Sequence, residues 1–358
     1  MVMARTGSAT LPLHGGKAPR WLFSRMAALS REITYATVRE LGRDAFLERL
    51  SDPGWFQALG CVLGFDWHSS GVTTTVTGAL KEGLRGMEAE LGVYMAGGKG
   101  AASRRTPAEI ALHAGRRGVD PSPFIYASRM SAKVDNTAIQ DGYQLYHHFF
   151  VFTPEGRWAV IQQGMNPGLG TARRYHWYSE AVSDFVVEPH RAVCCDLTGR
   201  TLNLAAAESG GARRTAAELA GQKPEDVMRE ISLALPRRHR VALSDINPKR
   251  LSSVLLKTYE RQPADFEALL SVEGVGPMTV RALSLVAELI YGEAPSYRDP
   301  ARYSFAHGGK DGTPFPVDRR AYDRTIEVMK RAIQSARVGD REKLDAVRRL
   351  ASFYGEGI

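Results

Sequence analysis

Hydrophobic and polar positions in the first half of the chain follow spacings that change from helical to extended. Apolar residues recur at helical spacing over residues 19–50 and 73–91, which predicts helices there. Residues 61–66 are a short apolar run, typical of a strand. Residues 121–140 return to a helical pattern, so this part of the chain is predicted to mix helices with strands.

The clearest extended pattern lies in the middle of the chain. Residues 146–152 and 157–163 are rich in aromatic and β-branched side chains, and the turn sequence TPEG separates them. This arrangement predicts a β-hairpin. Residues 182–187 and 191–197 are expected to add further strands.

Two low-complexity stretches suggest breaks in the fold. Residues 96–107 are glycine-rich and basic and predict a flexible loop, while residues 205–215 predict a linker. Beyond residue 216 the pattern is almost entirely helical. We therefore expect an α+β protein in which residues 1–204 form a mixed α/β domain with the catalytic groups and residues 216–358 form an all-α helix-hairpin-helix domain.

Charge and composition narrow the choice of partner. The 358 residues include 47 Lys and Arg against 39 Asp and Glu, a formal net charge of +8, which favours a polyanion. The three cysteines fit neither a disulfide framework nor a four-ligand zinc site. The chain has no apolar run of about 18 residues and no signal-like N-terminus, so we expect a cytoplasmic protein without membrane contact.

The most specific motif lies in the helical half, where residues 266–285 read FEALLSVEGVGPMTVRALSL. Two glycines one residue apart, followed by a helix start, allow backbone amides to bind a phosphate diester without reading bases. We expect DNA contacts from Gly274, Val275, Gly276 and Thr279. Alternatively, the two glycines only cap packed helices.

This segment resembles the helix-hairpin-helix motif of DNA repair proteins, and with the later sequence PVDRRA it is similar to the DNA glycosylase type. That resemblance places Asp318 near the sugar of a flipped nucleotide. Met278 stands where bifunctional members carry a lysine, and residues 293–315 read as an insertion. Asp318 could equally be a helix N-cap.

The whole chain resembles an uncharacterised prokaryotic family, domain-of-unknown-function family 763, through residues 6–22, TGSATLPLHGGKAPRWL. The resemblance implies an N-terminal domain joined to a helix-hairpin-helix region. It supplies no catalytic residues.

Candidate chemistry therefore comes from carboxylates and imidazoles of the first domain. Their types suit Mg²⁺ or Mn²⁺, which activate water for attack on a phosphodiester. The candidate catalytic residues are Asp66, Asp135, Asp141 and His148, and the candidate metal ligands are Asp66, His68, Asp135 and Asp141. A histidine among aromatic residues, such as His148, can also be structural.

Further DNA contacts are expected from two stretches. Arg173, Arg174 and Trp177 interleave cations with aromatic rings that could stack on unpaired bases, unless this strand simply turns aromatics inward and arginines outward. Arg129 and Lys133 begin a polar helical stripe that continues to residues 136 and 140 and either lines a groove or faces water.

Three functions fit these patterns. The first is a metal-dependent endonuclease acting on structured or partly unpaired DNA in repair or recombination. The second is a non-catalytic protein that binds particular DNA structures, and the third is a glycosylase-like repair enzyme.

Overall fold

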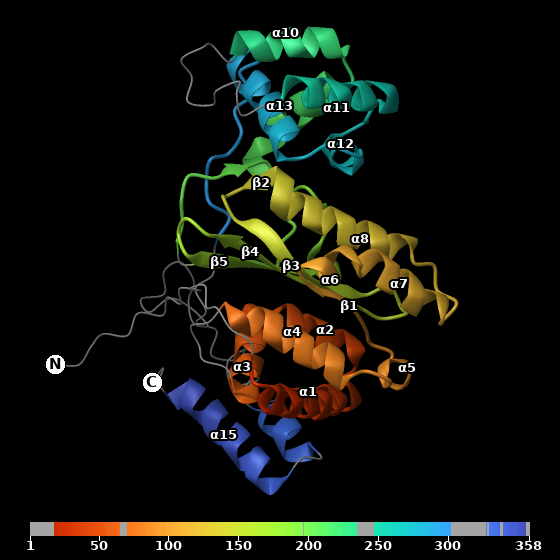
Figure 1. Ribbon diagram of the computed structural model, residues 1–358, viewed down its shortest axis with the longest axis vertical. Coiled ribbons are helices and arrows are strands. Elements are labelled where there is room, and N and C mark those ends of the chain that lie inside the picture. Colours follow the sequence, from red (N-terminus) through yellow and green to blue (C-terminus); the bar gives the residue numbers. More distant parts are fainter. Residues whose placement is uncertain are drawn as a thin grey trace, which may run out of the picture.

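A computed structural model describes residues 18–64, 70–195, 197–234, 247–301, 327, 329–336 and 339–355. The molecule is a stack of layers along its longest axis (Figure 1). A central sheet has helices on both faces, a further group of helices lies at one end, and α15 (Asp340–Gly355) lies at the other. The α+β class predicted from the sequence is confirmed.

The N-terminal layer consists of helices that share one apolar core. Asp52 caps the start of helix α3 (Pro53–Leu63), because its side chain accepts a hydrogen bond from the backbone N–H of Trp55 at 2.7 Å. Gly64 ends this helix in a left-handed conformation. The predicted strand at residues 61–66 is wrong over 61–63, because that apolar run is the buried end of this helix. The helices are α1 (Arg20–Leu41), α2 (Arg43–Ser51), α3 (Pro53–Leu63), α4 (Gly71–Gly83) and α5 (Glu88–Leu91).

The central sheet is antiparallel, with strand order β1-β3-β4-β5-β6. The predicted β-hairpin is confirmed as β3 and β4, with Phe152 opposite Trp158 beside the turn. Of the other two predicted strands, only a short part of 191–197 is extended, and residues 182–187 form bends. The strands are β1 (Tyr94–Lys99), β3 (Gln144–Phe152), β4 (Trp158–Asn166), β5 (Thr171–Tyr178) and β6 (Ala192–Cys194).

The predicted loop at residues 96–107 is wrong, because the segment contains the end of β1, helix α6 (Ala101–Arg104) and the start of α7 (Thr106–Gly115). Its glycines have a packing role instead. Gly97 has a φ of +91°, and a Cβ there would lie 2.2 Å from the carbonyl oxygen of His148 on β3. Only glycine allows the two strands to approach this closely.

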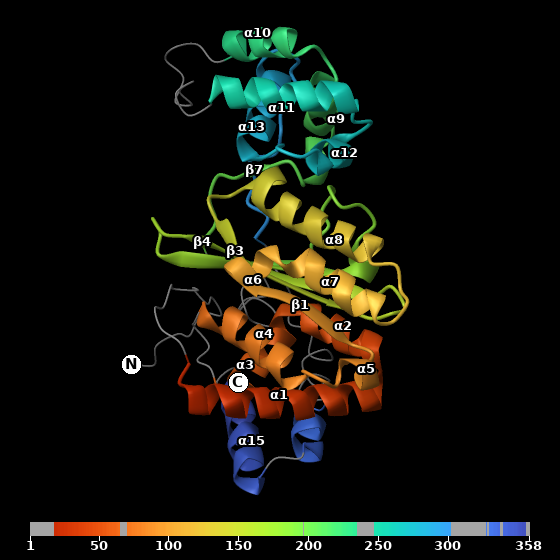
Figure 2. The same ribbon diagram turned by 45° about the vertical axis from the view of Figure 1, so that its right-hand side comes forward.

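Both faces of the sheet are buried. Phe149, Val151 and Ile161 pack against the N-terminal helices, whereas Phe150 and Val160 pack under α7 and α8 (Ser122–Lys133). Figure 2 shows α7 and α8 lying between the sheet and the helices at the far end. The chain leaves α8 through a turn of π-helix, η1 (Val134–Ala138), and a short strand, β2 (Ile139–Gln140), that pairs with β7 (Leu202–Asn203).

The predicted linker at residues 205–215 is wrong. It forms a 3-10 turn and then α9, and Arg213 donates hydrogen bonds to the carbonyl oxygens of Leu204 and Ala206, both at 2.6 Å. One apolar cluster runs from the sheet into these helices, so no break follows residue 204. The helices at this end are α9 (Gly210–Ala220), α10 (Pro224–Ala234), α11 (Pro248–Arg261), α12 (Phe266–Ser271) and α13 (Pro277–Leu289).

The C-terminal helix belongs to the opposite end of the molecule. Arg349 on α15 donates from Nε to the carbonyl oxygen of Val62 at 2.9 Å, and Met329 and Ile333 lie in the core of the N-terminal helices. The described residues beyond 216 are mostly helical, and they contribute to both apolar cores of the molecule. Across the described helices, none combines the length and apolar character that a membrane crossing requires.

Candidate nucleic-acid interface

The tight turn at residues 272–276, called here the glycine turn, joins α12 to α13. Gly274 has a φ of +93°, and a Cβ at this position would lie 3.2 Å from Cγ2 of Val254 on α11. Gly276 is extended, and its nearest neighbour would lie 3.9 Å from an added Cβ. The side chain of Val275 is buried and anchors the turn in the core. Gly274 is therefore required by conformation, whereas Gly276 leaves open space.

Several backbone amides of this turn have no partner within the described chain. Val275 donates to the carbonyl oxygen of Val272 at 3.2 Å and Val280 to that of Gly276 at 3.1 Å, whereas the N–H groups of Gly274, Gly276 and Met278 make no hydrogen bond to any described residue. Gly274 is exposed and the other two residues are half-buried. Free amides beside the positive end of the α13 dipole form an anion-binding surface.

The stripe predicted on one helix over residues 121–140 is divided, because α8 ends at Lys133 and Gln140 lies on β2. These two residues contact the glycine turn and the start of α13. Lys133 donates from Nζ to the carbonyl oxygen of Val275, and Gln140 donates to that of Pro277 at 2.8 Å. Arg281 in turn donates to Oε1 of Gln140 at 2.8 Å. Arg129 is exposed. The stripe therefore holds the turn in place and brings two cations, Lys133 and Arg281, close to it.

Helix α11 adds exposed positive charge beside the turn, since Val254 of this helix is the neighbour of Gly274. Lys257 lies 4.0 Å from the carboxylate of Glu273 within the turn. The exposed basic residues of this helix are Lys249, Arg250, Lys257 and Arg261. The surface around the turn thus suits a polyanion. The side chain of Thr279 is buried, so only its backbone could take part.

Asp135 lies in the π-helical turn and is fully buried. Its carboxylate accepts hydrogen bonds from Gln162 at 2.5 Å, Trp177 at 3.0 Å and His190 at 2.5 Å. Burial raises its pKa, against the opposing effect of His190. Gln162 accepts from Nδ1 of His148 at 2.8 Å, which links two predicted catalytic residues in one network. Both oxygens of Asp135 are therefore already occupied.

His148 completes this network at its other end. Its Nε2 lies 2.8 Å from Oγ of Ser128 on α8, and burial lowers its pKa to about 4, so the ring is neutral at neutral pH. The role of Gln162 in joining His148 to Asp135 was not predicted from the sequence. The predicted β-hairpin could have indicated it, because pairing Phe152 with Trp158 places Gln162 opposite His148.

Asp141 lies in a second, separate network. It accepts from Nη1 of Arg173 at 2.9 Å, from the hydroxyl of Tyr175 at 2.7 Å and from the backbone N–H of Tyr143 at 2.9 Å. Arg173 also donates to Asp299 at 2.8 Å. Burial opposes the charge on Arg173, but the carboxylates of Asp141 and Asp299 outweigh it and raise the pKa. Both carboxylate oxygens of Asp141 accept hydrogen bonds from the protein, and its side chain is only 1% exposed.

Arg173, Arg174 and Trp177 were predicted to contact DNA, and the structure contradicts this because all three side chains are at most 1% exposed. Arg174 lies on the opposite face of the sheet from the other two. It donates to Oε1 of Gln57 at 2.9 Å, and its guanidinium lies 4.7 Å from the ring centre of Phe56. These residues stabilise the sheet core, and Trp177 does so by donating to Asp135.

The described residues hold no group of three or more His, Cys, Asp or Glu side chains suited to a metal ion. Asp135 and Asp141 do not fit a metal, because hydrogen-bond donors already surround their carboxylates. The other two predicted ligands, Asp66 and His68, lie outside the described residues, as does Asp318.

The fold is that of a mixed α/β protein with a glycine turn between helices α12 and α13. The chain belongs to the family described as "Protein of unknown function (DUF763)", whose sequence model matches residues 7–317. Neither the curated proteins nor the solved structures gave a match.

Proposed function

We propose that the chain binds DNA through its phosphate backbone and that the glycine turn is the contact. The observation that supports this proposal is that the N–H groups of Gly274, Gly276 and Met278 bond to no residue in the part of the chain that the structure describes. Lys133 and Arg281 beside the turn and the basic residues of α11 add long-range attraction. Because backbone amides and cations contact phosphates rather than base edges, the binding is largely independent of sequence.

The test is a binding titration of the full chain with labelled duplex DNA at several salt concentrations. We expect the logarithm of the affinity to fall linearly with the logarithm of salt, by about 0.9 for each neutralised phosphate. Gly276→Val places methyl groups beside the free amides, where the structure has space for them, and should lower the affinity at least several-fold. Gly115→Val, where an added Cβ also meets nothing, is the matched control.

Two results would contradict the proposal. A folded Gly276→Val protein with native affinity would remove the glycine turn from the interface. A native protein without salt-dependent DNA binding would remove the proposed function altogether.

Metal-dependent hydrolysis of the bound DNA, with Mg²⁺ or Mn²⁺, is a separate proposal that rests on the sequence. The described carboxylates do not support it, since both are enclosed by protein donors. The glycosylase alternative rests on Asp318, outside the described residues. Backbone-directed binding is therefore the function that the geometry supports best.

A further inference from the structure

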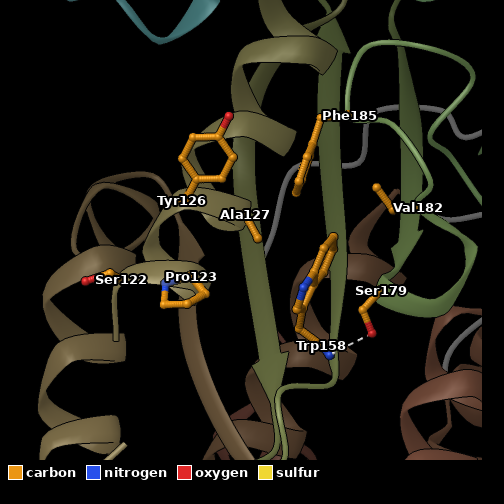
Figure 3. Close-up of a pocket in the computed structure, with 8 residues that line it drawn as sticks. All are labelled: Ser122, Pro123, Tyr126, Ala127, Trp158, Ser179, Val182 and Phe185. Atoms are coloured by element: carbon orange, nitrogen blue, oxygen red, sulfur yellow. Dashed lines mark hydrogen bonds between the residues drawn. The ribbon is translucent and has the colours of Figure 1, made fainter. Parts of the chain in front are cut away.

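A cavity of about 560 Å³ lies beside the N-terminal half of α8 (Figure 3). Its walls come from three parts of the chain: Pro123 and Tyr126 on α8, Trp158 at the start of β4, and Ser179 and Phe185 in the segment after β5. No predicted site residue lines it.

The aromatic side chains give the cavity a flat wall. The rings of Trp158 and Phe185 are nearly parallel, with an interplanar angle of 10° and centroids 6.0 Å apart. In Figure 3 both rings are seen edge-on, one beyond the other, and Pro123 and Tyr126 lie across from them. The ring of Tyr126 stands at 89° to Phe185 and is 41% exposed. Because the rings of Tyr126 and Phe185 are already in edge-to-face contact, with centroids 5.6 Å apart, the space open to a planar ring lies beside Tyr126, between Pro123 and the aromatic wall; it is called here the slot.

Hydroxyl groups lie at the edges of this slot. Ser122 and Ser179 line it, and the hydroxyl of Ser179 already accepts a hydrogen bond from the backbone N–H of Trp158 at 3.1 Å, which leaves it free to donate. Acidic side chains near the slot already have partners: Glu180 pairs with Arg157, Glu267 accepts a hydrogen bond from Tyr126, and Asp184 accepts one from the backbone N–H of Val186. A flat apolar wall with hydroxyls at its rim suits a nucleobase, which has an aromatic face and a polar edge.

The slot is connected to the glycine turn along α8. Tyr126 contacts Glu267 on α12, and Lys133 on the same face of α8 contacts Val275 in the turn. These two residues of α8 are separated by about 10 Å along the helix axis. Successive nucleotides of a stacked strand rise by about 3.4 Å along the DNA axis, so the span corresponds to the rise of about three nucleotides.

We propose that this slot binds a nucleobase ring, and that the ring is an unpaired base of the DNA strand whose backbone contacts the glycine turn. The second part of this inference rests on the proposed function. The first part stands on the slot alone, because a free nucleoside presents the same ring.

The experiment uses DNA with a central mismatched bubble that carries 2-aminopurine, a matched duplex of equal length, and free 2-aminopurine riboside. Stacking on the aromatic wall should quench the fluorescence of 2-aminopurine. The full-length native protein should bind the bubble about five-fold or more tightly than the duplex. Phe185→Ala and Tyr126→Ala should each reduce this preference and the quenching, while duplex affinity stays unchanged.

Trp21→Ala is the control, since Trp21 is 62% exposed on α1, which belongs to the helical layer on the other side of the sheet. Gly276→Val should weaken bubble and duplex binding together, which separates failure of the glycine turn from failure of the slot. Quenching of the riboside without any DNA binding would support the slot and overturn its link to DNA. Equal affinity for bubble and duplex together with an unquenched riboside would overturn the proposal, as would a preference that both slot variants retain.

Discussion

The buried carboxylate of Asp135 accepts three hydrogen bonds from side chains, so its replacement should lower the stability of the fold. Asp135→Asn keeps the shape but replaces one acceptor oxygen with a donor, so at least one of Gln162, Trp177 and His190 loses its partner. We expect a loss of about 1–3 kcal/mol in the free energy of unfolding, the usual cost of a buried unsatisfied group. Urea denaturation at neutral pH measures it.

DNA affinity of the same Asp135→Asn protein, measured below its unfolding transition, should equal that of the native chain. A stability equal to the native value would show that the buried network of Asp135 contributes nothing to the fold.

Two neighbouring histidines should make the fold sensitive to acid. Burial lowers the pKa of His148 to about 4 and that of His147 to about 3, whereas an unfolded chain protonates histidine near pH 6.5, about its ordinary value. Between these values the unfolded state binds more protons, so the free energy of unfolding decreases as the pH falls from about 6.5 towards 4. Each histidine contributes a slope of up to about 1.4 kcal/mol per pH unit.

Denaturation over a pH series that spans this window checks the slope. His148→Gln cannot bind the proton that His148 takes up on unfolding, so its slope should be smaller by one histidine's contribution. Identical slopes for the native and His148→Gln proteins would contradict the assignment.

Roles of single residues on β5 could not be predicted from alternation alone. In a sheet with one exposed face, Tyr175 and Trp177 would point inward and Arg174 outward. Here helices cover both faces, so the arginines are buried too and need acidic or amide partners. Two of those partners, Asp299 and Gln57, are more than 100 residues away in sequence, and no local pattern indicates them.

At the scale of elements, the chain passes from α8 through a π-helical turn after Lys133 and reaches the start of α13 with Gln140. Gln140 lies beyond that turn and joins the carbonyl oxygen of Pro277 to Arg281. Gln140→Ala removes both hydrogen bonds and should loosen the start of α13. We expect faster amide hydrogen exchange over residues 276–282, measured by mass spectrometry.

Gln144→Ala is the matched control for this change, because Gln144 is an exposed residue at the beginning of β3. Its exchange pattern over residues 276–282 should remain native. Protection that is unchanged in Gln140→Ala would show that the hydrogen bonds of Gln140 do not hold the start of α13.

Elements were predicted well where their signals were local. The β3–β4 hairpin has its turn sequence between two extended segments, and the turn between α12 and α13 has its glycines in place. Strand β1 was missed because Gly97 and Gly98 weaken any strand pattern, and the reason for glycine there is the approach of β3 about 50 residues later. Residues 205–215 have the composition of a linker, but their small side chains also suit tightly packed helices, and here they form the start of α9.

At the scale of the whole molecule, the two ends of the described chain pack against each other, which composition does not indicate. The last helix packs on α3 through Arg349, so the ends of the described chain share one apolar core. The helices around the glycine turn share a second core with the other face of the sheet. The end of the molecule that carries the glycine turn is therefore packed continuously against the sheet, whereas the predicted two-domain division would have separated them.

The nuclease hypothesis can now be tested more sharply at this scale. Asp135 and Asp141 are enclosed by donors from the protein, so metal-dependent cleavage would have to use other ligands, and Asp66 and His68 are the two remaining predicted ones. We expect cleavage of bubble DNA with Mg²⁺ or Mn²⁺ to be abolished by EDTA, by Asp66→Asn and by His68→Ala, whereas folded Asp135→Asn cleaves at near the native rate. Each variant should retain native DNA affinity, measured in EDTA, because the glycine turn is unchanged.

Loss of cleavage in a folded Asp135→Asn protein would instead place that buried carboxylate in the chemistry. Intact strands with every metal and DNA structure would remove hydrolysis from the function and leave backbone-directed binding as the activity to explain.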